Sequence, residues 1–439
     1  MPSRSLSTTD RRPDPGRAGR PTPPHLARLT LADLTAEDFD AFHEAAQRGF
    51  QEEAPAEAVE FDRGLFEPDR FYGHRAGGRW VSTFGAHDRH VTVPGGAALP
   101  VAAVTAVTVQ GPYRRRGLLT EMMTRQFADA RRRGDPLAAL YASESGIYGR
   151  FGYGQAAPRA RLAGRTPSMR FRPDVAGLLD AAGGSVDEVS RDDYLAQVVD
   201  LHDRLLPARP GALDRPAKWW PQALYDLQFA RGGATALRYV VGYDASGRVD
   251  GHATYRIKDD YTVTGANNEV RIGEVESETS AGYARLWRYL FDLDLARQFL
   301  RRNAPVDDPV RHLVADPRAI HTELIDGLYL RLLDVPTALS ARRYAAEAEL
   351  VIQVRDGMVE SNAGRYALQL GPDGASVRRA RRRPDVSLDV RELGTVYLGG
   401  PSLGELHRAG LVTEHRPGAV AAASAAFGWP VAPFCADSF

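Results

Sequence analysis

The chain has a single cysteine, no long apolar run and no excess of charge of one sign. Because Cys435 is the single cysteine among 439 residues, the chain cannot form an internal disulfide framework; so low a cysteine content is typical of proteins of the reducing cytoplasm. No apolar run approaches the ~18 residues that a membrane-spanning helix requires. Basic and acidic residues number 56 each, so no overall field directs the chain to nucleic acid or to an anionic membrane. We therefore expect a globular cytoplasmic protein that binds neither, with Cys435 buried or incidental rather than a reactive thiol.

Patterns for metal binding and for export are also lacking. His87 and His90 form a spaced pair, but no further ligand lies near them in the sequence, so we expect no metal site. The pair Arg11-Arg12 is not followed by the apolar stretch of an export signal. Residues 1–25 are rich in Arg, Pro, Ser and Thr, and we expect them to be a disordered extension.

Length predicts about three domains, and the order of predicted helices and strands predicts mixed α/β (α+β) structure. A chain of this length is too long for one core, and 43% hydrophobic residues can fill several. We place the domains at residues 26–165, 166–335 and 336–439. Apolar periodicity predicts helices at residues 36–48, 194–206, 281–299, 391–398 and 420–427. It predicts strands at residues 79–86, 90–93, 102–109, 236–243, 249–258, 268–276, 348–354, 365–370 and 386–390.

The most informative segment is a basic turn between a strand and a helix. The strand of residues 102–109 leads through three consecutive arginines, Arg114 to Arg116, into a helix that begins at Gly117. A helix N-terminus offers unpaired N–H groups and the positive end of its dipole to an anion. Glycine lets a phosphate approach the backbone, and arginine adds charged, forked donors. The segment predicts a pyrophosphate site, the alternative being a solvated basic turn.

The spacing Arg114-x-x-Gly117-x-Leu119 resembles the acetyl-CoA loop of the GNAT acyltransferases. Together with residues 141–154, it closely resembles the Eis (enhanced intracellular survival) family of actinobacterial acetyltransferases, as do residues 326–335 and the terminal phenylalanine. The resemblance covers nearly the whole chain beyond the first two dozen residues. It implies tandem GNAT domains followed by a domain like sterol carrier proteins, acetyl-CoA as cosubstrate, and a homohexamer.

The second domain repeats the order of elements of the first but not its basic turn. In the equivalent place it has Glu276-Ser277-Glu278-Thr279-Ser280, whose carboxylates repel a pyrophosphate. We therefore expect a degenerate GNAT unit that shapes the acceptor pocket.

The resemblance also implies roles for individual residues on the cofactor side. A backbone N–H at Val109 binds the thioester oxygen, and Val107 lines the pantetheine. The remaining contacts to acetyl-CoA come from Arg114, Arg115, Gly117, Leu118 and Ser143. Tyr148 is the general acid, a role that suits a phenol with an ordinary pKa of about 10 because it is protonated at neutral pH. The alternative for Tyr148 is packing in the core.

On the acceptor side, the resemblance makes the α-carboxylate of Phe439 the base or the group that orients the amine. Chain ends are normally frayed, but the apolar residues from Trp429 onward make a tail that can dock. Residues 50–62 carry five acids, Glu52 and Glu53 among them, and no base. They form either a wall for a cationic acceptor or an exposed acidic helix.

These features lead us to expect an acetyl-CoA-dependent N-acetyltransferase of primary amines, aminoglycosides foremost, acting at several sites per molecule. One alternative is a protein-lysine acetyltransferase without antibiotic activity. Another is a lipid or hydrophobe carrier in which the GNAT unit is vestigial.

Overall fold

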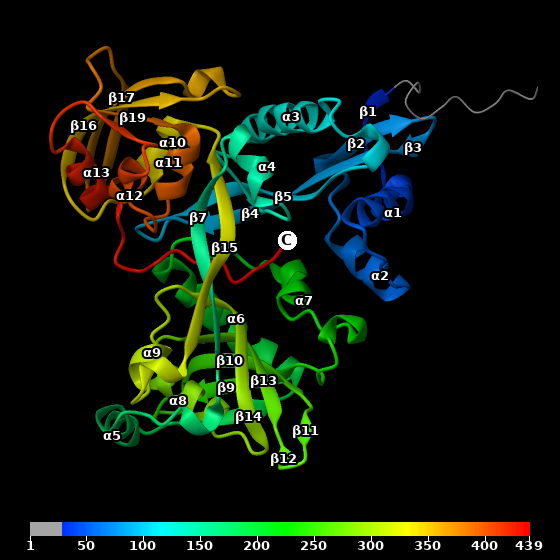
Figure 1. Cartoon of the computed structure of the whole chain (residues 1–439), viewed down its shortest axis with the longest axis vertical. Coiled ribbons are helices and arrows are strands. Elements are labelled where there is room, and N and C mark those ends of the chain that lie inside the picture. Colours follow the sequence, from blue (N-terminus) through cyan, green and yellow to red (C-terminus); the bar gives the residue numbers. More distant parts are fainter. Residues whose placement is uncertain (1–28) are drawn as a thin grey trace, which may run out of the picture.

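A computed structural model describes residues 29–439 (Figure 1). The extension expected at residues 1–25, with its Arg11-Arg12 pair, lies outside this range. Within it, no helix is both long enough and apolar enough to cross a bilayer.

One thirteen-stranded sheet runs through the first two GNAT-like units. The first unit contributes β1 (Leu29–Asp33), β2 (Phe71–Ala76), β3 (Arg79–Trp80), β4 (Ser82–Thr92), β5 (Ala98–Val109), β6 (Leu137–Tyr141) and β7 (Gly154–Gly164). The second contributes β8 (Ser185–Val189), β9 (Arg238–Tyr243), β10 (Val249–Lys258), β13 (Asn268–Ser277), β14 (Ala296–Pro305) and β15 (His321–Leu332). Their order is β1-β2-β4-β5-β6-β15-β7-β14-β13-β10-β9-β8, with β3 paired to β2; the short β11 (Tyr261–Thr262) and β12 (Gly265–Ala266) form a separate hairpin.

Two long strands join the units, as Figure 1 shows for β7 and β15. Residues 328–332 of β15 pair with β6, and residues 321–330 pair with β7. β7 in turn pairs with β14 of the second unit. The last strand of the 166–335 segment therefore lies within the sheet of the first unit, so residue 165 does not mark a break in the sheet.

The helices of the first unit cover its part of the sheet. They are α1 (Phe39–Phe50), α2 (Ala56–Leu65), α3 (Leu118–Arg133) and α4 (Ser145–Tyr148). The inner face of α3 carries Met122, Met123 and Phe127, which pack in one core with Phe84 and Val104 of the sheet. This burial fixes the start of α3 against the end of β5.

β4 is one continuous strand, whereas the sequence predicted a turn between residues 86 and 90. The turn was predicted between the strands of residues 79–86 and 90–93, but Arg89 in this interval belongs to β4 and is fully buried. Its guanidinium lies over the Trp219 ring at 4.2 Å and donates to Asp214 Oδ1 at 3.2 Å. The predicted turn was wrong because this charge is neutralised by the second unit rather than by water.

The second unit has α5 (Pro173–Ala182), α6 (Arg191–Leu205), α7 (Trp220–Ala223), α8 (Ser280–Phe291) and α9 (Val310–Leu313). The helix predicted at residues 281–299 is wrong beyond Phe291. The chain turns at Leu295, whose φ is 62°, and continues as β14. Phe299 on β14 lies 5.1 Å, centroid to centroid, from Phe291 on α8. Apolar residues of α8 and of β14 are buried in the same core. The sequence therefore showed one continuous apolar pattern, which predicted a single long helix.

The third domain pairs a five-stranded sheet with four helices. The strands, in the order β18-β17-β16-β19-β20, are β16 (Ala348–Arg355), β17 (Gly364–Gly371), β18 (Gly374–Arg379), β19 (Val386–Asp389) and β20 (Thr413–Glu414). The helices are α10 (Val335–Ala341), α11 (Val390–Val396), α12 (Leu403–Arg408) and α13 (Ala419–Phe427). Arg331 of β15 is fully buried and donates to both oxygens of Asp356 at 2.8 and 2.9 Å. This ion pair joins the third domain to the large sheet.

The last twelve residues, 428–439, form a tail without regular secondary structure. The tail leaves the third domain after α13 and ends at the centre of the molecule, between the two GNAT-like units (Figure 1). Cys435 in this tail is buried, as predicted.

Candidate active site

The strand β5 continues beyond its pairing with β6, which ends at Val104. Their parallel register covers residues 101–104 of β5 and 137–140 of β6, while β5 stays paired with β4 as far as Val109. The register of β5 with β4 shifts next to Ala106, which has a φ of 52°. Thr83 Oγ1 donates to the carbonyl oxygen of Ala106 at 2.7 Å. Beyond this bulge, the half-buried Val107 and Val109 pack against the hydrophobic cluster that contains Tyr148.

The basic turn after β5 has the backbone of an anion site. Arg115 and Gly117 both have positive φ, 62° and 82°. A Cβ added at Gly117 would meet nothing within 4 Å, so glycine is required there by backbone conformation rather than by space. The buried Leu118 anchors the first turn of α3, and Arg114 Nε donates to the carbonyl oxygen of Val109 at 3.1 Å. Arg114 and Arg115 are exposed beside this helix N-terminus, where an anion is favoured.

Ser143 and Tyr148 belong to the segment between β6 and β7. Ser143 is exposed at the bend that follows β6, and Tyr148 is the last residue of α4. Tyr148 is 8% exposed and shares one hydrophobic cluster with Val107 and Val109. Burial, with a smaller contribution from the charge of Glu144, raises the pKa of Tyr148 to about 12. The phenol is therefore protonated at neutral pH and can donate a proton.

The end of the chain lies in a cavity beside the bulge of β5. The cavity, of about 190 Å³, is lined by Phe439 together with Thr105 and Ala106, the first residues of β5 beyond its pairing with β6. Aromatic side chains from both GNAT-like units complete much of the wall; they are Phe39, Phe42, Phe50, Phe66, Phe71 and Trp219. The chain terminus and the bulge of β5 thus meet in one space.

The tail is held in place by polar contacts on both sides. Tyr141 at the end of β6 donates to the carbonyl oxygen of Asp437 at 2.8 Å, and its ring lies 5.4 Å from that of Phe439. Arg215 Nε donates to Asp437 Oδ1 at 2.9 Å, and Arg215 Nη1 donates to Glu274 at 3.0 Å. Arg215 and Asp437 are 5% and 7% exposed, so their interaction is shielded from water.

Besides the chain terminus, the ionisable side chains that line the cavity are Asp62, His43 and His87. Asp62 Oδ2 lies 2.8 Å from His43 Nε2, and both side chains line the cavity. Burial, with the charges of Lys218, Arg89 and Arg70, lowers the pKa of His87 to about 3, so its imidazole is neutral. Glu52 and Glu53 are exposed and do not line this cavity. Of the acidic segment, it is Asp62 on α2 that reaches the cavity.

Several of these residues carried no recognisable signal in the sequence. Asp62 stood in the acidic segment, but its position in the cavity depends on how α2 packs. Trp219 and Arg215 belong to a loop of the second unit and reach the site only through the packing of the two units. The described residues contain no group of three or more His, Cys, Asp or Glu side chains that could hold a metal ion. His87 lies within the cavity wall, and His90 Nδ1 lies 3.2 Å from Asp214 Oδ2.

A bulged strand followed by a basic turn at a helix N-terminus defines an acyltransferase of the GNAT class. Residues 30–156 and 211–332 each match the acetyltransferase (GNAT) domain family, and residues 335–436 match the sterol carrier protein domain. The chain is 39% identical over 411 residues to an uncharacterized N-acetyltransferase of Streptomyces avermitilis, covering 92% of this chain and 98% of that protein.

Known Eis proteins are similar in sequence and in structure. The N-acetyltransferase Eis of Mycobacterium tuberculosis is 35% identical over 320 residues, which are 71% of this chain and 74% of Eis. The crystal structure of Eis1 from Mycobacterium abscessus superimposes with a TM-score of 0.81 at 32% identity, covering 93% of this chain and all of Eis1. The chain therefore belongs to the Eis family of GNAT N-acetyltransferases. It is an enzyme with acetyl-CoA as cosubstrate, which sets aside the non-enzymatic alternative.

Proposed function

We propose that this enzyme acetylates primary amines of polycationic acceptors, aminoglycosides among them, and does so at more than one amine of the same molecule. The observation that carries the proposal is the cavity in which Phe439, Asp62 and the bulge of β5 meet. A carboxylate beside aromatic walls suits an ammonium group, through charge and through cation–π contact.

The size of the cavity limits what can enter it. Drug-sized ligands occupy pockets of about 300–1,000 Å³, and this cavity holds about 190 Å³. Only the amine-bearing end of an aminoglycoside fits, while the rest of the molecule stays outside. Glu52 and Glu53 are exposed just after α1, whose Phe50 lines the cavity. We propose that they attract the remaining ammonium groups of the acceptor.

In the proposed chemistry, the Phe439 carboxylate acts on the acceptor, while Val109 and Tyr148 act on the thioester of acetyl-CoA. The acceptor nitrogen loses a proton to the Phe439 carboxylate, directly or through water, and attacks the thioester carbonyl carbon. A backbone N–H at Val109 stabilises the oxygen while the C–S bond breaks. The Tyr148 hydroxyl gives its proton to the departing thiolate, and the second proton that the acceptor nitrogen loses on becoming an amide nitrogen passes through water to the Tyr148 phenolate. Val107, Arg114, Arg115, Gly117, Leu118 and Ser143 hold the cosubstrate in this scheme.

The proposal assigns one task to each part of the chain. Residues 26–165 supply the cofactor side, residues 166–335 form a degenerate GNAT unit that shapes the acceptor pocket, and residues 336–439 supply the terminal carboxylate. We further propose a homohexamer acting in the cytoplasm, where its single buried cysteine stays reduced. Light scattering on the purified chain measures the subunit number directly.

A thiol-release assay with acetyl-CoA tests the acceptor class. Aminoglycosides, polyamines and lysine-containing peptides are compared at equal concentration, and mass spectrometry counts the acetyl groups added to each. Turnover with aminoglycosides that gives products with several acetyl groups supports the proposal. Turnover confined to lysine peptides supports the alternative, a protein-lysine acetyltransferase without antibiotic activity.

A further inference from the structure

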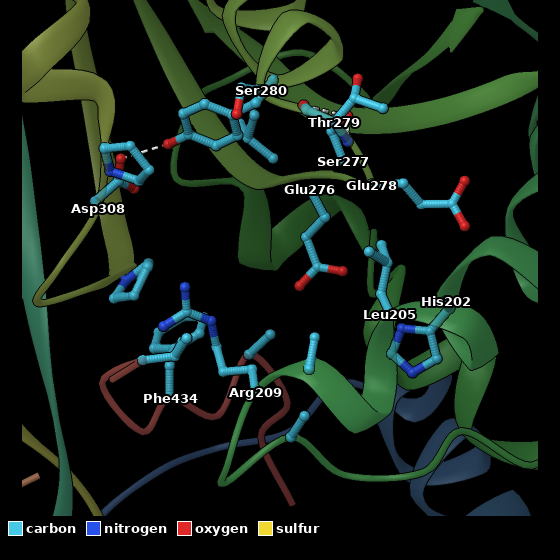
Figure 2. A pocket seen from close by; sticks show the side chains of 18 of the residues that line it. His202, Leu205, Arg209, Glu276, Ser277, Glu278, Thr279, Ser280, Asp308 and Phe434 are labelled. Carbon is cyan, nitrogen blue, oxygen red and sulfur yellow. Dashed lines mark hydrogen bonds between the residues drawn. The ribbon is translucent and has the colours of Figure 1, made fainter. Parts of the chain in front are cut away.

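The second unit contains a larger cavity than the proposed acceptor site, at the position equivalent to the cofactor site of the first unit. It has a volume of about 500 Å³ and lies between β13, the start of α8 and the C-terminal tail (Figure 2). Much of its wall is apolar, formed by Leu205, Leu206, Val275, Pro305, Leu313 and Phe434. The tail residues Phe434, Ala436 and Asp437 close one side.

Most charged groups in this cavity already have partners. Glu278 forms ion pairs with Arg204 at 2.6 Å and Arg248 at 2.8 Å. Asp308 accepts from Arg301 at 2.5 Å, and Arg209 donates to Asp307 at 2.9 Å. These pairs leave little net charge for a ligand to satisfy.

Glu276 is the exception. Its carboxylate points into the cavity in Figure 2 and lies 3.5 Å from Nε2 of His252, a longer contact than those of the paired carboxylates above. His252 is itself engaged with the hydroxyl of Tyr194 at 2.8 Å. Although burial alone raises the pKa of Glu276, the neighbouring His252 and Arg215 lower it below its usual value, so the carboxylate is ionised.

A second, independent feature points to a missing donor. His202 lines the same cavity, is 6% exposed, and has no hydrogen-bond partner on either ring nitrogen. Burial lowers the pKa of His202, so the ring is neutral and one of its nitrogens is a free acceptor. Buried polar atoms without partners are uncommon and costly.

We infer that this cavity is a binding site for a small organic ammonium ion with an apolar body, held by the Glu276 carboxylate and the free nitrogen of His202. The ammonium group donates to both acceptors, and the apolar body packs on Leu206, Val275 and Phe434. The start of α8 has no basic turn, so this cavity lacks the arginines that are proposed to bind a pyrophosphate in the first unit. A ligand here touches the tail that ends in Phe439, so the site lies next to the acceptor side of the enzyme without being part of it.

Calorimetry on the full chain, without acetyl-CoA, tests this site with phenylethylamine as the probe. The wild type is expected to show a binding component that Glu276→Gln weakens at least about tenfold, the loss of one charge-assisted hydrogen bond. Ser280 is exposed and lines the cavity, so the larger side chain of Ser280→Trp should narrow the entrance and remove the same binding component. Asp62→Asn, in the proposed acceptor cavity, should leave it unchanged, which separates this site from the proposed function.

The neutral isostere phenylethanol and the anion phenylacetate are the matched probes, and neither should bind. Unchanged acetyl-CoA affinity and circular dichroism in Glu276→Gln exclude misfolding. A phenylethylamine isotherm that is the same in Glu276→Gln and Ser280→Trp as in the wild type overturns the inference. So does equal binding of phenylethanol, because the cavity would then select the apolar body and not the charge.

Discussion

Tyr148 and Tyr153 are two phenols of one buried cluster, with ring centroids 6.1 Å apart. Burial is the main cause that raises the pKa of each, and both are protonated at neutral pH. Their surroundings differ. Tyr153 is 1% exposed and its hydroxyl has no partner, whereas Tyr148 ends α4 beside Val107 and Val109. This difference supports our proposal that Tyr148, and not Tyr153, gives its proton to the leaving group.

Replacing Tyr148 by phenylalanine tests this difference. Tyr148→Phe should lower kcat by about 10²- to 10⁴-fold, the range for loss of one general acid, with little change in acetyl-CoA affinity. Tyr153→Phe is the control, since it removes a hydroxyl that has no partner and should keep kcat near the wild-type value. Steady-state kinetics measures both variants. Equal kcat in Tyr148→Phe and wild type would assign Tyr148 to packing.

His87 makes the stability of the protein depend on pH. Its pKa is about 3 in the folded state because of burial, against about 6.5 when unfolded. Below pH 6.5 the unfolded chain binds a proton that the folded chain does not, so stability falls as the pH drops from 6.5 toward 3. The slope from this group is at most about 1.4 kcal/mol per pH unit. Above pH 6.5 the imidazole of His87 is neutral in both the folded and the unfolded chain, so this group no longer makes stability depend on pH.

We expect His87→Phe to flatten this dependence. The melting temperature of the wild type should fall more steeply between pH 6.5 and pH 4.5 than that of the variant, as followed by calorimetry. His90→Gln is the control, because His90 lies on the same strand with its side chain about half exposed. If His87→Phe and wild type lose stability in parallel, other groups carry the acid sensitivity.

At the scale of elements, the sequence predicted the parts that local patterns define. The strand, basic turn and helix around Gly117 follow from periodicity and from glycine at a positive φ. Two predictions were wrong, the turn within β4 and the continuation of the helix beyond Phe291. In both cases tertiary packing decided the structure, because Arg89 and Phe299 contact residues that no local pattern identifies. The insertion of β15 beside β6 and the position of Asp62 in the cavity arise the same way. No local pattern encodes them.

The basic turn is a property of an element, and its charge can be tested as one. The double variant Arg114→Glu, Arg115→Glu should weaken acetyl-CoA binding, since in the proposed scheme each arginine supplies a charge-assisted contact of about 1.5–3 kcal/mol. Arg131→Glu, Arg132→Glu makes the same charge change at the opposite end of α3, where both side chains are exposed. Calorimetry with acetyl-CoA compares the pairs. Similar affinities in both pairs would place the pyrophosphate elsewhere.

At the scale of the whole molecule, the tail brings the three domains together at one point. It starts in the third domain, is bound by Arg215 of the second unit and Tyr141 of the first, and ends in the cavity beside β5. Asn303 Nδ2 also donates to the carbonyl oxygen of Ala436 at 3.2 Å. These contacts fix residues 435–437, so the position of the last residue follows from the packing of all three domains.

Cys435 reports whether the tail is docked. Burial is the main cause that raises the pKa of its thiol to about 12, and the thiolate is the reactive form. A thiol reagent at pH 8 should therefore modify Cys435 slowly in any variant whose tail stays in place. Arg215→Ala, which removes the ion pair to Asp437, provides the comparison with a loosened tail.

The last prediction concerns the chain end itself. Adding one glycine after Phe439 moves the carboxylate and leaves every internal residue in place, and deleting Phe439 shifts it the other way. Both changes should cripple acetyl transfer, because a displacement of about 1 Å in a positioned group can cost about 10² in rate. Acetyl-CoA affinity should barely change, since the basic turn does not line the cavity that holds Phe439, and Cys435 should stay protected. A glycine-extended enzyme that acetylates aminoglycosides as fast as the wild type, with Cys435 still protected, would transfer the role of base to Asp62 or to its acidic neighbours.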